Sequence, residues 1–150
     1  MALMETIMAD MKLAMKNREK LQLETLRTIR AALMEKEVER RPAGAVTPDD
    51  EISVLNSALK KRREASEIYR QHGRADLADQ EDKESEIIRR YLPQQLSSSE
   101  VEQQVKNVIG IVGAQSAKDV GKVMSVLMKD LKGKADGKLI QETVKKLLGA

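Results

Sequence analysis

Hydrophobic residues recur at intervals of three and four in seven segments of this 150-residue chain, and this periodicity constrains the fold more than any other feature. Such spacing places side chains on one face of an α-helix. The clearest stripe is formed by Val101, Val105, Val108, Ile109 and Val112. No segment shows the two-residue alternation of a strand. The sequence therefore predicts an all-α fold.

Aromatic residues are nearly absent, since the chain has two Tyr and neither Phe nor Trp. Aliphatic side chains and Met must therefore fill the interior, which suits packing of helix on helix. The hydrophobic content of 41% and charged content of 34% are typical of a globular protein rather than a disordered one.

A change in composition near Pro93 predicts two domains. Every Arg precedes it, whereas residues 96–150 hold nine Lys and six acids, which accounts for the whole net charge of +3. We expect an N-terminal helical domain over residues 1–93, with about four helices that include an antiparallel hairpin. Residues 94–150 are expected to form a small three-helix tail bundle.

Capping signals give the helix boundaries. Thr47 precedes a proline and two acids, which predicts a helix from there toward Gly73. The next helix is expected over residues 76–92, because Pro93 disfavours helical geometry at Leu92. In the tail, the capping signals are Ser97 with Glu100, Ser116 with Asp119, and Asp136.

If these two long helices form a hairpin that turns at residues 72–74, Arg62 or Arg63 faces Glu84, and Ser66 faces Glu81. Both glutamates then lie in an otherwise apolar stripe. We interpret Arg62, Arg63, Glu81 and Glu84 as a structural ion-pair network that aligns the helices. Recognition of a partner and carboxylate acid–base chemistry are the alternatives.

The residue inventory excludes several enzyme classes. The chain has no Cys and one His, so it cannot form a Ser–His or Cys–His catalytic arrangement. His72 lies in a predicted turn and follows no glutamate by three residues, unlike the ligands of di-metal bundles. No glycine-rich phosphate loop is present. We predict no catalytic residues, no metal site and no cofactor.

Lysines of the last third form a candidate nucleic-acid surface. Within a predicted helix, Lys118, Lys122 and Lys129 fall in a narrow arc opposite the apolar stripe, and Lys134 and Lys138 continue around the following turn. Such a surface could follow a phosphate backbone. Without aromatic residues it cannot stack bases, so any RNA would be recognised by shape and phosphates. An ordinary solvated helix face is the alternative.

The joint pattern of these residues resembles the GatB/YqeY family over essentially the whole chain. The N-terminal likeness is carried by Leu26-Arg27, Lys61-Arg62, Tyr69, Gly73–Ala78, Glu81, Glu84 and Tyr91-Leu92-Pro93. The C-terminal likeness, to the tail domain of the GatB subunit of aspartyl/glutamyl-tRNA amidotransferase, is carried by Ala117–Met124, Lys134–Lys138 and Val144-Lys145.

The resemblance implies a helical N-terminal region and a tail that holds the body of a tRNA. Lys118, Lys122 and residues 134–138 would then face the tRNA. It also associates the chain with carbon–nitrogen ligases that use glutamine as amido donor, although the family's catalysis is done by parts that this chain lacks. The chain is expected to be a small free-standing member.

These observations predict a non-catalytic binding module that contacts tRNA, or a tRNA-amidation or translation-related protein, and neither DNA nor a membrane. The alternative is a protein–protein adaptor without RNA contact, which uses the Met-rich first helix. Glu5, Asp10 and Lys12 interrupt the apolar start of the chain, unlike a signal peptide. We therefore expect a cytoplasmic protein.

Overall fold

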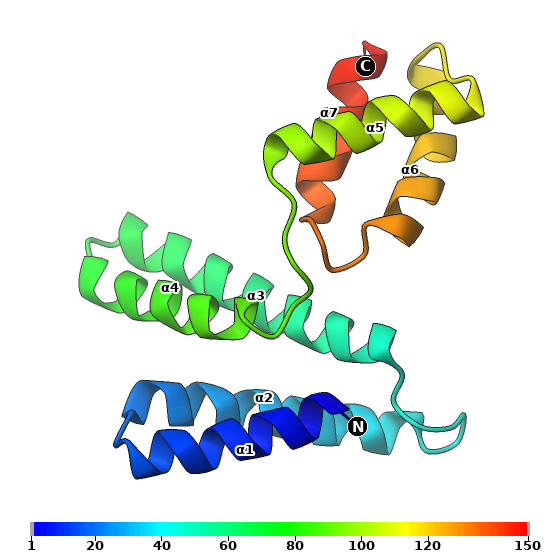
Figure 1. Ribbon diagram of the computed structural model, residues 1–150. Helices are drawn as coiled ribbons and strands as arrows, with labels where there is room; N and C mark the ends of the chain where they lie inside the picture. Colours follow the sequence, from blue (N-terminus) through cyan, green and yellow to red (C-terminus); the bar gives the residue numbers. More distant parts are fainter. Residues whose placement is uncertain (1, 150) are drawn as a thin grey trace. The chain divides into compact units, whose positions relative to one another are not determined.

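The computed structural model describes residues 2–149, and every regular element in that range is a helix (Figure 1). The predicted all-α fold is confirmed. The elements are α1 (Ala2–Lys16), α2 (Lys20–Arg40), α3 (Pro48–Gln71), α4 (Ala75–Arg89), α5 (Ser98–Val112), the 3₁₀ turn η1 (Ala117–Asp119), α6 (Val120–Asp130) and α7 (Gly137–Leu148).

The chain divides into two compact units, Met1–Leu92 and Pro93–Ala150. In the first unit, α1 and α2 form one antiparallel hairpin and α3 and α4 form another, and α2 contacts both helices of the second hairpin (Figure 1). Aliphatic side chains from all four helices fill its interior. The buried members of this core are Ile7, Leu26, Ile29, Leu33, Leu55, Ala58, Ile87 and Ile88.

The start of α3 follows the predicted capping chemistry. The Asp50 backbone N–H donates to the Thr47 hydroxyl at 3.2 Å, and the Thr47 backbone N–H donates to the Asp50 carboxylate at 2.9 Å. Arg40, at the end of α2, pairs with the same carboxylate at 3.1 Å. Hydrogen bonds from Thr47, assisted by the Arg40 charge, lower the pKa of Asp50. This cluster fixes the connection between α2 and α3.

Helix α4 ends at Arg89, three residues before the predicted end at Leu92. The N–H groups of Tyr91 and Leu92 donate to the carbonyls of Ile88 and Arg89, three residues back, so the chain tightens into turns ahead of Pro93. The tighter path lets the Tyr91 hydroxyl donate to the Asp10 carboxylate at 2.5 Å. Tyr91 thereby connects the end of α4 to α1.

The second unit packs α5, α6 and α7 around a core of aliphatic side chains. Its buried members are Val101, Val105, Val108, Val123, Leu127, Leu131, Ile140 and Val144. Ser97 and Glu100 form the predicted capping box at α5, and Gly113 ends that helix with a left-handed φ of 69°. Asp136 caps α7 through the Lys138 backbone N–H at 3.0 Å.

Within residues 2–149, no helix is both long and apolar enough to cross a membrane.

We expect Ile88→Ala to lower the free energy of unfolding of the first unit by about 2–5 kcal/mol, because Ile88 is fully buried and truncation leaves a cavity. Urea titration followed by tyrosine fluorescence measures this unit alone, since Tyr69 and Tyr91 both belong to it. Val38 is 61% exposed, so Val38→Ala should change the value by less than about 0.5 kcal/mol. Equal effects of the two substitutions would contradict this account of the core.

Candidate nucleic-acid interface and ion-pair network

The five candidate lysines lie on three elements of the second unit and one connection, and all are exposed. Lys122 and Lys129 are on α6, seven residues apart and therefore on one helix face. Lys134 lies in the connection between α6 and α7, and Lys138 lies in the first turn of α7. Lys129, Lys134 and Lys138 thus lie around the α6–α7 corner, whereas Lys122 lies in the first turn of α6, at the other end of that helix.

Lys118 differs from the prediction, because it lies in the 3₁₀ turn η1 and not on α6. The Asp119 carboxylate accepts hydrogen bonds from the backbone N–H groups of Gln115 and Ser116 at 2.9 and 3.2 Å. These bonds, helped by the Lys122 charge, lower the pKa of Asp119. A turn held in this way interrupts the regular helix, so the predicted arc holds only for Lys122 and Lys129.

The backbone that carries Lys134 is fixed from both sides. Its N–H donates to the Leu131 carbonyl at 2.9 Å, and its carbonyl accepts from the Leu96 N–H at 2.8 Å. The Gln95 side-chain amide donates to the neighbouring Gly133 carbonyl at 2.6 Å. Gln95 and Leu96 are contributions that sequence reasoning missed, because no local pattern shows which distant carbonyl a segment before α5 will meet. The α6–α7 corner is therefore preorganised.

The predicted ion pair between the two long helices is present in the first unit. Arg62 Nε on α3 lies 3.1 Å from a carboxylate oxygen of Glu84 on α4, and the two side chains are only 11% and 17% exposed. Arg62 Nη1 also donates to the Ala58 carbonyl at 3.2 Å. These two bonds fix how α3 and α4 align. The partner of Glu84 is thus Arg62, and the neighbouring Arg63 is exposed.

Glu81 has a different environment from Glu84. It is half-buried, and its carboxylate forms no ion pair with the residues in the range 2–149. Burial raises the pKa of Glu81, as does the nearby Glu84 charge, while attraction to Arg62 opposes the rise. The two carboxylates therefore do not share one ion-pair network as predicted.

The prediction that Ser66 faces Glu81 is wrong. The buried Ser66 hydroxyl donates to the Asp82 carboxylate at 2.8 Å, and Arg70 donates to that carboxylate at 2.6 Å. These two bonds lower the pKa of Asp82. A one-residue change in the facing register turns Asp82 toward α3 in place of Glu81. Pairing residues by the sum of their numbers across a hairpin is accurate only to about one position, so it does not show which of two consecutive residues faces the other helix.

The charged side chains of the two units have different surroundings. Within the described residues 2–149, no group of three or more His, Asp or Glu side chains has a geometry that could hold a metal ion. Glu84 is held by Arg62, and the candidate lysines of the second unit are exposed to solvent. The fold and these sites define an all-helical chain of two units, one with an internal ion pair and one with a lysine-bearing corner.

Comparison with known proteins identifies the family. The YqeY-like protein family matches residues 4–148, and the chain belongs to this family. A protein of Clavispora lusitaniae named altered inheritance of mitochondria protein 41, mitochondrial, is 29% identical over 133 residues, which cover 87% of this chain and 76% of the relative. A protein of the same name from Pyrenophora tritici-repentis is 26% identical over 149 residues, with 96% and 80% covered. An uncharacterised protein of Schizosaccharomyces pombe is 34% identical over 86 residues, with 57% and 68% covered.

The names of the first two relatives contradict the expected cytoplasmic location, because both are described as mitochondrial. The expectation relied on charged residues near the start of the chain. In the structure those residues belong to α1, where Ile7 and Ala14 are buried and Asp10 accepts the Tyr91 hydrogen bond. Their composition reflects the packing of α1 and carries no information about the compartment.

A double-mutant cycle tests the ion pair. Arg62→Met and Glu84→Gln should each destabilise the first unit, and the cycle should show a coupling energy of about 1–2 kcal/mol, because either single change leaves a half-buried charge unpaired. Tyrosine-monitored urea unfolding provides the measurement. Pairing Glu84→Gln with Lys60→Met, a change at an exposed cation, should give a coupling near zero. Coupling of the same size in both cycles would contradict a specific Arg62–Glu84 interaction.

The raised pKa of Glu81 predicts a pH-dependent stability difference. A carboxyl whose pKa is raised by folding contributes stability below its unfolded pKa and loses it as the pH rises through the folded value. Glu81→Gln should therefore be more stable than the wild-type protein at pH 7, with the advantage shrinking toward pH 4. Urea unfolding across this pH range, with the exposed Glu67→Gln as a control for lost charge, provides the test. If the stability advantage of Glu81→Gln over the wild-type protein grew as the pH fell, it would contradict a raised pKa of Glu81.

Proposed function

We propose that this protein is a non-catalytic binding module that contacts tRNA through the exposed lysines of its second unit. The observation that carries the proposal is the exposure of Lys118, Lys122, Lys129, Lys134 and Lys138 over η1, α6, the α6–α7 connection and α7. The anchoring of the Lys134 backbone supports it, because a fixed backbone lowers the entropy that ordering on binding would cost.

Charge and composition support contact with phosphates over contact with bases. The second unit carries the five candidate cations and contains neither Tyr, Phe nor Trp for base stacking. A helical surface that presents lysines can follow the backbone of a folded RNA and recognise its shape. Each lysine that neutralises a phosphate releases counterions, so the affinity should fall steeply with salt.

Likeness to the tail of the GatB subunit of tRNA-dependent amidotransferases supports tRNA as the RNA class. On this proposal the chain acts beside a tRNA-amidation or translation-related complex, and any carbon–nitrogen ligase activity with glutamine as donor belongs to that complex. The ion pair that holds Glu84 on Arg62 supports a role without acid–base chemistry of its own.

The test replaces Lys118, Lys122 and Lys138 by Glu in one variant. Binding to total tRNA in a gel shift at moderate salt should be abolished, and the slope of log affinity against log salt should fall by about 1 for each phosphate-binding lysine that is replaced. A matched variant with Lys106, Lys145 and Lys146 replaced by Glu changes the net charge equally, from +3 to −3, on other exposed positions of the same unit. If the first variant bound tRNA as the wild-type protein does, or if both variants lost tRNA binding equally, Lys118, Lys122 and Lys138 would not be the tRNA-binding residues.

A further inference from the structure

A shallow hollow of about 420 Å³ lies in the first unit, between the start of α2 and the second half of α4. Residues 19–22 line it on the α2 side. On the α4 side it is lined by Lys83, Glu86, Ile87 and Arg90, whose spacing of three, four and seven residues places them on one helix face. The hollow therefore combines an apolar part with several charged side chains.

The turn that leads from α1 into α2 holds one wall of this hollow. The Glu19 N–H donates to the Ala14 carbonyl at 2.9 Å, and the Lys20 N–H donates to the Arg18 carbonyl at 3.1 Å. Arg18 has a left-handed φ of 58°, which is uncommon for a residue other than glycine. These bonds fix the backbone that carries Glu19 and Lys20, so this wall is preorganised.

The hollow has an excess of positive charge. Three of its cations form no ion pair within residues 2–149, namely Lys20, Lys83 and Arg90. Of its two acids, Glu86 pairs with Arg89, whereas Glu19 has no ion-pair partner in that range. One acid is thus left to balance three cations.

A neighbouring hollow does not remove this excess. It has a volume of about 500 Å³, lies toward the start of α4, and shares Lys20 and Lys83 with the first hollow. Its two aspartates are held by arginines, in the pairs Arg74–Asp76 and Arg70–Asp79. Glu24 is its one other acid. Even with Glu24 included, the three cations outnumber the acids that have no ion-pair partner.

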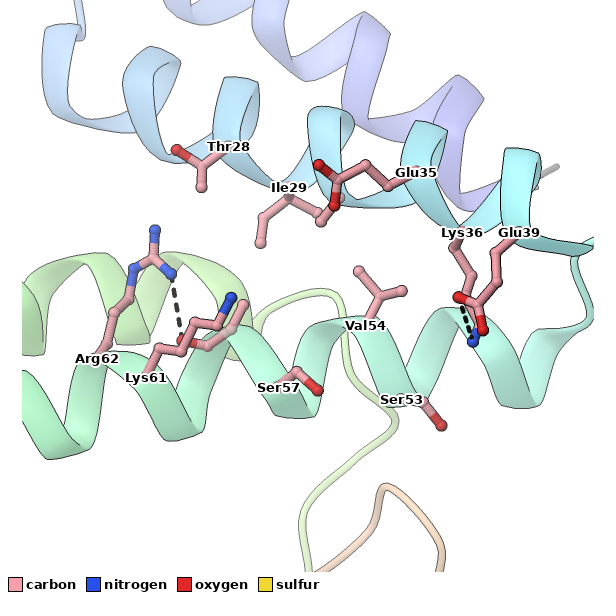
Figure 2. A pocket seen from close by; sticks show the side chains of 12 residues that line it. Thr28, Ile29, Glu35, Lys36, Glu39, Ser53, Val54, Ser57, Lys61 and Arg62 are labelled. Atoms are coloured by element: carbon pink, nitrogen blue, oxygen red, sulfur yellow. Dashed lines mark hydrogen bonds and ion pairs between the residues drawn. The ribbon is translucent and has the colours of Figure 1, made fainter.

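The groove of about 300 Å³ between α2 and α3 differs, because its charges balance (Figure 2). Figure 2 shows Lys36 joined to Glu39, at 3.1 Å. Arg62 is neutralised by Glu84, and the remaining charged residues of this groove are one lysine and one glutamate. Short side chains line the middle of the groove, among them Ala32 and Ser57. Charge therefore distinguishes the hollow beside α4 from this groove.

Three cations around one hollow suit an anion with three contact atoms. A phosphate monoester has three terminal oxygens that accept hydrogen bonds, whereas a carboxylate has two. Lys83 and Arg90 lie about 10 Å apart along the α4 axis, and both side chains are long enough to reach the turn between them. Lys20 approaches from the α2 side. Arginine offers a planar fork and lysine a compact charge, and both bind phosphate.

We propose that the hollow between the start of α2 and the end of α4 binds the phosphate group of a phosphate monoester. The three cations contact its terminal oxygens, and the group that carries the phosphate rests on Leu21 and the nearly buried Ile87. The Glu19 carboxylate repels the ligand and limits its affinity. The site lies in the first unit and shares no residue with the candidate lysines of the second unit, so it does not depend on the proposed tRNA contact.

The experiment titrates the full chain with inorganic phosphate at pH 7.5 and constant ionic strength, with chloride as the balancing anion. Amide chemical shifts in ¹⁵N-labelled protein report the binding. The amides of residues 19–22 and 83–90 should shift and saturate, with a Kd of the order of millimolar because the cations are exposed. Acetate, with two oxygens, should bind about tenfold more weakly.

Substitutions should change the Kd for phosphate in opposite directions. Lys83→Gln combined with Arg90→Gln should raise it about tenfold, and Glu19→Gln should lower it about two- to fivefold. Glu19 makes no side-chain capping bond to α2, so its replacement removes charge without removing a cap. A matched control, Arg30→Gln combined with Lys60→Gln, removes one Arg and one Lys at exposed positions outside the hollow and should leave the Kd unchanged. Circular dichroism checks that each variant keeps its helices.

Shifts that rise linearly without saturation, equal Kd values for acetate and phosphate, or the same effect in the hollow and control variants would overturn the proposal. Two further ligands identify the source of the phosphate. An RNA oligonucleotide that binds more tightly with a 5′ phosphate than with a 5′ hydroxyl would assign the site to an RNA end. Glycerol phosphate that binds as tightly as the phosphorylated RNA would assign it to a small phosphate monoester. Because inorganic phosphate tests the site without RNA, a negative result leaves the tRNA contact of the second unit to its own gel-shift test.

Discussion

Burial of aliphatic stripes is the constraint on which both units depend. Because the chain has only two aromatic residues, no large ring can bridge an interior by itself. Each helix must present a continuous line of Leu, Ile, Val or Met to several neighbours at once. The fully buried Ile88 and Leu26 in one unit, and Val105 and Val123 in the other, show this requirement being met. Positions left to short side chains, such as Ala32 and Ser57, become surface grooves.

Polar contacts then determine the alignment that aliphatic packing leaves open. Smooth stripes tolerate sliding of one helix along another, whereas the Arg62–Glu84 pair and the Ser66–Asp82 hydrogen bond are satisfied in one register only. Tyr91 extends the same principle by joining the end of α4 to Asp10 on α1. In the second unit, hydrogen bonds from Gln95 and Leu96 fix the corner that carries Lys134.

The two units differ in how their charged side chains are held. The match to the YqeY-like family covers residues 4–148 and so includes both units. Arg62 and Glu84 pair inside the first unit, whereas the candidate lysines of the second unit are exposed.

Local chemistry in the sequence determined the helices and their caps at Thr47, Ser97 and Asp136, because periodicity and capping act over neighbouring residues. The sequence also indicated that Arg62 or Arg63 faces Glu84. Tertiary structure decided the rest. The choice of Asp82 over Glu81 as the partner of Ser66, and of Arg62 over Arg63 as the partner of Glu84, depends on contacts between α3 and α4. The groove between α2 and α3 is also a tertiary feature, since an empty space exists only when two surfaces are brought together.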